Sequence, residues 1–275
     1  MKCAWKELIS ILPHRIRGEV EKYERQGLQE IRMRQGRFLE LVLSSGSQWT
    51  NHEVSVADIQ FTVNAASRYS PWSAATVQDG YITASGGHRI GLCGECVVQD
   101  GRMTGIRNVT SACIRVARDV TGIGIEINRE HGSVLLLGPP GSGKTTLLRD
   151  TVRKLSVSGA VTVVDERGEV FPIGSGFDFG PRVDVLTNCG KAQGVISALR
   201  SMGPQWIAVD EITSKEDCNA LLEAGWCGVS LLATAHARDK LDLLTRPVYQ
   251  PIVKSGLFDT LVFLQQDKSW RMERM

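Results

Sequence analysis

One glycine-rich segment of eight residues constrains the fold of this chain more than any other feature. It runs from Gly138 to Thr145 and matches the pattern G-x-x-x-x-G-K-[ST] at every fixed position. An apolar run from Val134 to Leu137 precedes it, and a stretch with helical character, TTLLRDTVRKL, follows it. In such a strand–loop–helix frame, glycines let successive backbone N–H groups surround a phosphate at the positive end of a helix. The segment therefore predicts a phosphate-binding P-loop in an α/β domain.

The side chains of this loop have predictable roles if the phosphate belongs to ATP. We expect the Lys144 ammonium to bridge the β- and γ-phosphates, and the Thr145 hydroxyl to bind Mg²⁺. ATP and Mg²⁺ are therefore the expected ligands. The residues predicted to bind the nucleotide are Gly138, Pro139, Pro140, Gly141, Ser142, Gly143, Lys144, Thr145 and Thr146.

Two carboxylates end a second apolar run, Trp206 to Val209. Asp210 is expected to hold Mg²⁺ through water, and Glu211 to act as the catalytic base that polarises the attacking water. An acidic pair at a strand end can also simply open a helix. Its position downstream of a P-loop favours the functional interpretation.

A further acidic group closes the run 160–166. Asp165, Glu166 and Glu169 are either solvated acids or a cluster near the attacking water. In the second case, Glu166 is the alternative catalytic base to Glu211.

The run 229–233 leads into Thr234 and His236. Either side chain is expected to sense the γ-phosphate, although a histidine at a strand end is often structural. This run also predicts an extra strand inserted beside the P-loop strand, and only one strand, 160–166, is expected between the P-loop and the acidic strand.

Short apolar runs alternate with helical stretches through the second half of the chain, which predicts a parallel sheet covered on both faces. The first half instead mixes helices and hairpins. Its expected elements are a helical region 4–27 broken at Pro13, strands 28–34 and 37–45, helices from Ser55 and Pro71, and strands from Gly80 with a turn at Asp100-Gly101. The predicted domains are an α+β domain over 1–118, a linker over 119–131 and a RecA-like P-loop ATPase domain over 132–275.

The overall charge and the cysteines limit the classes of function that the chain can have. The net charge is only +2, from 32 basic and 30 acidic residues, so no nucleic acid partner is expected. The chain shows no uninterrupted apolar span and no secretory signal pattern. Seven cysteines without such a signal indicate reduced thiols, and the Cys93–Cys96 pair lacks further ligands with zinc-site spacing.

The C-terminal half resembles the type II/IV secretion ATPases. The motifs that carry this resemblance are the acidic box 164–169, Leu199-Arg200 with Pro204, the acidic strand with Asp210-Glu211-Ile212, and Thr234-Ala235-His236. A closer resemblance covers nearly the whole chain and is to the family of stage III sporulation protein AA. It rests on GPPGSGKTTLLRD, VVDERGEV, GPRVDVLTNCGKAQG, VDEI, EIRMRQGRFLELV and GYITASGGHRIGLCGECVV.

This resemblance implies an ATPase in the cytoplasm of the mother cell of an endospore-forming bacterium, peripherally associated with a membrane complex. Its implied partners are further copies of itself, as a hexameric ring, and the membrane-embedded proteins of a sporulation channel. It also implies that an arginine near the end of the first domain reaches the nucleotide phosphates. The candidates are Arg115, foremost, with Arg89, Arg107 and Arg118.

One departure from the family pattern concerns the residues after Ile212. Thr213-Ser214 stand where the family tends to carry glycine or arginine, so no arginine role is expected at that position. Two alternatives stay open at this point: a RecA-like ATPase driven by nucleic acid, and a P-loop scaffold that binds nucleotide without turnover. The chain has no NKxD motif of GTPases and no LSGGQ-like signature of transporter cassettes.

Overall fold

The computed structural model describes residues 2–23, 27–68, 80–127, 132–172 and 174–275, so the helix expected from Pro71 lies outside the described residues. The chain divides into two compact units. The first comprises Met1–Asp119 and Pro172–Phe177, and the second comprises Val120–Phe171 and Asp178–Met275. A short segment that follows the acidic box in sequence therefore belongs to the first unit.

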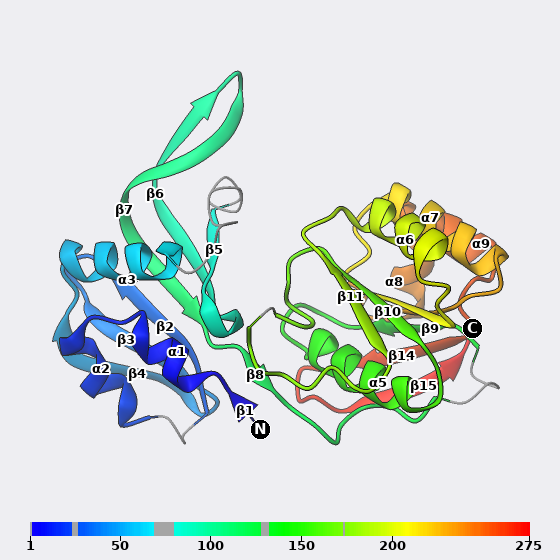
Figure 1. Ribbon diagram of the computed structural model, residues 1–275, viewed down its shortest axis with the longest axis horizontal. Coiled ribbons are helices and arrows are strands. Elements are labelled where there is room, and N and C mark those ends of the chain that lie inside the picture. The colour runs from blue at the N-terminus through cyan, green and yellow to red at the C-terminus, as the bar shows by residue number, and fades with distance from the viewer. Residues whose placement is uncertain (1, 24–26, 69–79, 128–131, 173) are drawn as a thin grey trace. The chain divides into compact units, whose positions relative to one another are not determined.

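The first unit is built on a six-stranded antiparallel sheet with the order β4-β3-β2-β7-β6-β5 (Figure 1). Its strands are β2 (Leu28–Arg34), β3 (Phe38–Leu43), β4 (Gly46–Glu53), β5 (Tyr81–Thr83), β6 (Arg89–Gln99) and β7 (Arg102–Arg115). A separate short pair joins β1 (Lys2–Cys3) to β8 (Arg118–Asp119). The helices are α1 (Trp5–Ser10), α2 (His14–Glu21) and α3 (Val56–Arg68), with a 3₁₀ turn η1 (Ser85–Gly87).

Helices cover one face of this sheet. Ile31 and Met33 of β2 are fully buried in a core shared with apolar residues of α1, α2 and α3. Arg32 and Arg34 alternate with them and point to the opposite face, where Arg34 pairs with Glu40 at 2.6 Å. This alternation is typical of an antiparallel sheet with one buried and one polar face.

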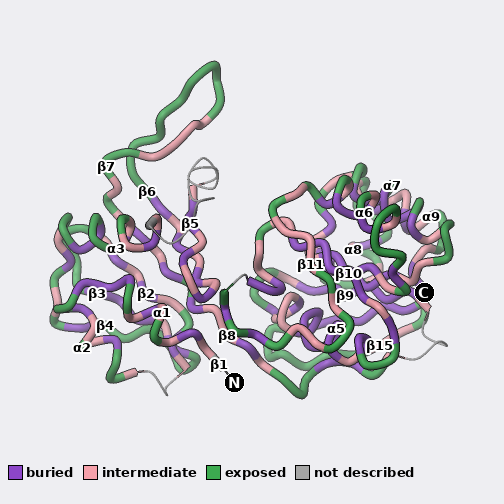
Figure 2. Tube along the Cα trace, viewed as in Figure 1, coloured by how far each residue is buried: buried purple, intermediate pink, exposed green. Residues whose placement is uncertain are grey.

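Strands β6 and β7 form a hairpin that extends beyond the rest of its sheet (Figure 1). Asp100 and Gly101 have φ values of 51° and 75°, which confirms the predicted turn. The outer part of the ribbon is mostly exposed (Figure 2), and Val98 exposes 61% of its surface. Strand β7 begins at Arg102, directly after this turn, and its outer half is polar and has no buried face.

The second unit contains a seven-stranded sheet with the order β11-β10-β12-β13-β9-β14-β15 (Figure 1). Six strands are parallel: β9 (Val134–Leu137), β10 (Val161–Asp165), β11 (Val183–Thr187), β12 (Trp206–Val209), β13 (Ser230–Ala235) and β14 (Thr260–Leu264). Strand β15 (Trp270–Arg274) is antiparallel to β14. The helices are α5 (Lys144–Ser158), α6 (Lys191–Ser201), α7 (Lys215–Trp226), α8 (Lys240–Thr245) and α9 (Gln250–Lys254), with a 3₁₀ turn η3 (Pro247–Tyr249).

Alternate strand residues of this sheet enter two separate cores. Leu136 of β9 packs in the core that contains Leu148 of α5, whereas Leu135 and Leu137 pack in the core that contains Leu221 of α7. Both faces are therefore covered by helices, as the apolar runs predicted.

Strand β13 pairs with both β9 and β12, which confirms the predicted inserted strand beside the P-loop strand. The prediction of a single strand between the P-loop and the acidic strand was wrong, because both β10 and β11 lie there. Strand β11 forms one edge of the sheet and is only partly buried, so it lacks the continuous apolar run by which the central strands were found. Within the described ranges, no helix is both long enough and apolar enough to span a bilayer.

Candidate nucleotide-binding site

The parallel register brings the predicted functional residues to one edge of the second unit's sheet. Val209 pairs with Ala233, and Ala235 pairs with Leu137, so β12, β13 and β9 end at nearly the same level. The residues that follow their carboxyl ends therefore meet, which is where open α/β sheets bind ligands.

The backbone of the P-loop depends on glycine at three positions. Gly141 and Gly143 have φ values of +73° and +97°, which residues with a Cβ rarely adopt. A Cβ on Gly138 would lie 2.7 Å from Ser142 Oγ and 2.8 Å from the Leu264 carbonyl oxygen. The loop is thus held tightly against β14, and α5 begins directly after it at Lys144.

Lys144 lies over the loop that carries it. Its ammonium donates hydrogen bonds to the carbonyl oxygens of Gly138 at 2.8 Å and Pro139 at 2.9 Å. Burial lowers the pKa of Lys144, and the nearby charges of Asp210 and Glu211 oppose that shift. The cation is therefore placed at the loop that would hold the phosphates.

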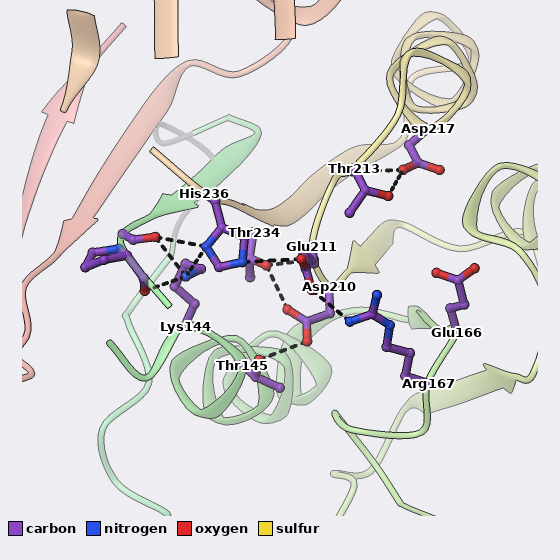
Figure 3. A network of polar contacts seen from close by, with 12 residues as sticks. Lys144, Thr145, Glu166, Arg167, Asp210, Glu211, Thr213, Asp217, Thr234 and His236 are labelled. Atoms are coloured by element: carbon purple, nitrogen blue, oxygen red, sulfur yellow. Dashed lines mark hydrogen bonds and ion pairs between the residues drawn. The ribbon is translucent and has the colours of Figure 1, made fainter. Parts of the chain in front are cut away.

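Asp210 joins the P-loop helix to the inserted strand (Figure 3). Thr145 Oγ1 donates a hydrogen bond to one of its carboxylate oxygens at 2.9 Å, and Thr234 Oγ1 donates to the other at 2.7 Å. A threonine hydroxyl and a carboxylate are hard oxygen ligands of the kind that Mg²⁺ binds together with substrate phosphates. Thr145 and Asp210 are therefore suited to be the protein ligands of the predicted Mg²⁺.

Glu211 adopts an unusual backbone conformation, with φ = 56°. Its backbone N–H donates to Thr234 Oγ1 at 2.7 Å, and the next N–H, of Ile212, donates to the Thr234 carbonyl at 2.8 Å. A left-handed conformation at a residue other than glycine costs about 1–3 kcal/mol and persists only where its surroundings impose it. These two bonds hold the backbone of Glu211 against Thr234, and its side chain contacts His236 and Arg167.

His236 bridges Lys144 and Glu211 (Figure 3). Its Nδ1 lies 3.1 Å from the Lys144 ammonium, and its Nε2 lies 3.3 Å from Glu211 Oε1. An ammonium only donates and a carboxylate only accepts, so in these two contacts Nδ1 is the acceptor toward Lys144 and Nε2 is the donor toward Glu211. His236 thereby connects the predicted phosphate-binding cation to the predicted base.

Asp165 is not a solvated acid, because only 1% of its surface is exposed. Its carboxylate accepts hydrogen bonds from the backbone N–H groups of Glu169 (2.8 Å), Val170 (2.9 Å) and Phe171 (2.9 Å). Asp165 thus organises the loop of the acidic box. Burial, together with the charge of Asp210, nevertheless raises the pKa of Asp165 to about 6.

Two cations of this site were not predicted from the sequence. Lys191, at the start of α6, is 6% exposed and forms an ion pair with Glu166. Arg167 Nη1 lies 3.3 Å from Glu211 Oε2. A pocket is lined by these two cations and by five acids, namely Asp165, Glu166, Glu169, Asp210 and Glu211. The position of Arg167 within the acidic box was a signal that could have identified it.

The predicted arginines lie in the first unit. Arg115 is 3.7 Å from Glu30, and its side chain is 67% exposed. The other three also have contacts within the unit: Arg89 lies over the Tyr81 ring, Arg107 pairs with Glu95, and Arg118 donates to the Leu28 carbonyl. Their approach to a nucleotide stays a prediction.

The chain belongs to the family described as sporulation stage III, protein AA, whose model matches residues 4–272. It is 34% identical to stage III sporulation protein AA of Bacillus subtilis (strain 168), over 95% of this chain and 91% of that protein. This result confirms the family suggested by the sequence motifs.

Two solved structures share the fold. The ATPase DotB of Legionella pneumophila superposes with a TM-score of 0.58 and 16% identity, over 93% of this chain and 78% of that chain. The pilus retraction motor PilT with bound ADP superposes with a TM-score of 0.62 and 17% identity, over 89% of this chain and 76% of that chain. These similarities confirm the predicted class, a RecA-like α/β domain preceded by a smaller α+β domain.

The buried Asp165 predicts a specific dependence of stability on pH. Because its pKa is raised above the unfolded value of 3.8, the folded protein binds the proton more tightly than the unfolded chain does. The stabilising contribution is therefore complete below about pH 4 and is lost as pH rises through about 6, by up to about 3 kcal/mol. Urea unfolding without Mg²⁺ should show this loss in the wild type and not in Asp165→Asn. A wild type that instead gains stability over Asp165→Asn as pH rises would mean that the three N–H bonds outweigh burial.

Proposed function

We propose that this protein is an ATP-hydrolysing motor of the secretion-ATPase class that acts during endospore formation. The observation that carries the proposal is the contact between Thr145 and Asp210, which joins the P-loop to the acidic strand at 2.9 Å. Lys144 and Glu211 lie on the same sheet edge, linked through His236. This set combines a phosphate-binding cation, two magnesium-binding oxygens and a base, which phosphoryl transfer to water requires.

Each side chain has a distinct role in this proposal. Lys144 binds the β- and γ-phosphate oxygens, while Thr145 and Asp210 hold Mg²⁺, the latter through water. Bound Mg²⁺ neutralises charge on the phosphates during transfer. Glu211 orients the attacking water and accepts its proton. His236, which lies between Lys144 and Glu211, senses the γ-phosphate.

The family and proteins of similar fold support a wider role for this ATPase. The B. subtilis relative is a stage III sporulation protein, and the two solved structures are described as an ATPase and a pilus retraction motor. We infer a cytoplasmic hexameric ring in the mother cell, peripherally attached to a membrane complex. Its ATP turnover powers a channel formed by membrane-embedded sporulation proteins between mother cell and forespore.

The proposal predicts a loss of nucleotide binding in Lys144→Ala. Without the cation, the phosphates lose a charge-assisted contact, so turnover should fall by at least about 10²-fold and ATP and ADP should both bind more weakly. Phosphate release and calorimetric titration measure the two effects. Lys154→Ala, in the same helix and paired with Glu126, is the control and should behave as wild type. Normal turnover in Lys144→Ala would refute the P-loop assignment.

Glu211→Gln should separate binding from chemistry. The substitution preserves size but removes the proton acceptor, so ATP should still bind while turnover falls by roughly 10²–10⁴-fold. Glu166→Gln is the matched variant, because Glu166 lines the same pocket and is neutralised by Lys191. If Glu166→Gln loses turnover and Glu211→Gln keeps it, the acidic box supplies the base instead.

A ring that completes its site with an arginine should show two linked properties. Specific activity should rise with protein concentration, and Arg115→Ala should reduce turnover by about 10³-fold, the lower end of the range for arginines supplied to a phosphoryl-transfer site. Arg102→Ala, at the other end of β7, is the control. A protein that is monomeric by light scattering and fully active in the turnover assay would contradict the ring. Wild-type rates in single alanine variants of all four candidates would exclude this use of arginine; these candidates are Arg89, Arg107, Arg115 and Arg118.

A further inference from the structure

The pocket contains two cations that the proposed mechanism does not use, Lys191 and Arg167, and Arg167 is the more exposed of the two. Only its Nη1 makes a contact, at 3.3 Å from Glu211 Oε2, and the side chain is 47% exposed. Its remaining N–H donors have no protein acceptor within the described parts of the chain. An arginine with one long contact to a carboxylate and several donors to spare can take another acidic ligand.

The main chain that carries Arg167 is fixed in place. Strand β10 pairs with β12 through Val164 and Val209, so the residues after both strands lie side by side. Gly168 N–H closes a turn on the Asp165 carbonyl at 3.1 Å, and the Asp165 carboxylate fixes the residues that follow. The guanidinium can therefore move while its Cα stays beside Glu211.

Lys191 is not an equivalent candidate. Its side chain is 6% exposed and its ammonium is held by Glu166. Withdrawing it would leave a buried or half-buried charge without its partner, which is costly. Exchanging the partner of the half-exposed Arg167 costs much less.

Polar contacts run without interruption from the P-loop to Arg167 (Figure 3). They pass from Lys144 to His236, from His236 to Glu211 Oε1, and from Glu211 Oε2 to Arg167. Arg167 thus lies two side chains from the cation that binds the β- and γ-phosphates under the proposed function. A γ-phosphate carries more charge than a carboxylate and attracts a guanidinium more strongly.

We propose that Arg167 is a γ-phosphate ligand supplied by the same chain, which exchanges Glu211 for the γ-phosphate when ATP binds. This inference rests on the proposed ATPase function and deepens it. The exchange is of hydrogen bonds only: the guanidinium leaves Glu211 Oε2 and donates to γ-phosphate oxygens. The released oxygen then accepts a hydrogen bond from the attacking water. ADP has no γ-phosphate, so Arg167 stays on Glu211 and distinguishes the two nucleotides.

The test compares nucleotide affinities of the full chain in the presence of Mg²⁺. Calorimetric titration with the non-hydrolysable β,γ-imido analogue of ATP and with ADP gives two dissociation constants for each variant. Arg167→Ala should weaken binding of the analogue by about 10- to 100-fold, as expected for a lost hydrogen bond to a charged group, and that of ADP by no more than about twofold. Arg167→Lys keeps the charge and should recover part of the loss. Arg271→Ala, which removes an exposed partner of Glu273, should change neither affinity.

Two results would overturn the inference. In the first, Arg167→Ala binds the analogue as tightly as the wild type does. In the second, it weakens the analogue and ADP equally, which would give Arg167 a structural role. If a thermal melt shows that Arg167→Ala does not fold, Arg167→Lys is used for the same comparison of analogue and ADP affinities. A loss of affinity that is equal for the two nucleotides in Arg167→Lys would count against the inference. The same titrations with Lys144→Ala distinguish a failure of this inference from a failure of the proposed function. Unchanged affinity of Lys144→Ala for both nucleotides would refute the proposed function itself.

Discussion

Asp210 accepts hydrogen bonds from two threonine hydroxyls, and the arrangement of the site depends on this pair of contacts. Thr145 donates from the first turn of α5, and Thr234 donates from the inserted strand β13. Thr234 is fully buried and also accepts the backbone N–H of Glu211. Losing a partner from such a network leaves buried polar groups unsatisfied, so the two hydroxyls hold the P-loop, the acidic strand and Glu211 in a common geometry.

Sequence reasoning predicted the parts of this site that are encoded by local patterns. The glycines between Gly138 and Gly143 specify a backbone shape, so the loop could be recognised without tertiary information. Asp210 and Glu211 were found because they end a continuous apolar run. The pairing of Arg167 with Glu211 depends instead on β10 lying beside β12, which no local pattern encodes.

The two units differ in how strongly their sequences reveal their structure. Central strands of the second unit are buried on both faces, so their apolar runs are unmistakable, whereas the edge strand β11 is partly exposed and was missed. In the first unit, the outer half of β7 has neither an apolar run nor a buried face. Similarity at 16–17% identity to DotB and PilT fits this view, because burial pattern and strand order can persist while most side chains change.

The left-handed conformation of Glu211 has a consequence for how this protein can vary. At φ = 56°, glycine adopts the left-handed conformation without steric cost and asparagine adopts it more readily than glutamate, so either substitution would relieve backbone strain. Both would also delete the carboxylate that contacts His236 and Arg167. Backbone stability and retention of this carboxylate are therefore opposed at this one residue, and selection for a more stable fold alone would remove the carboxylate.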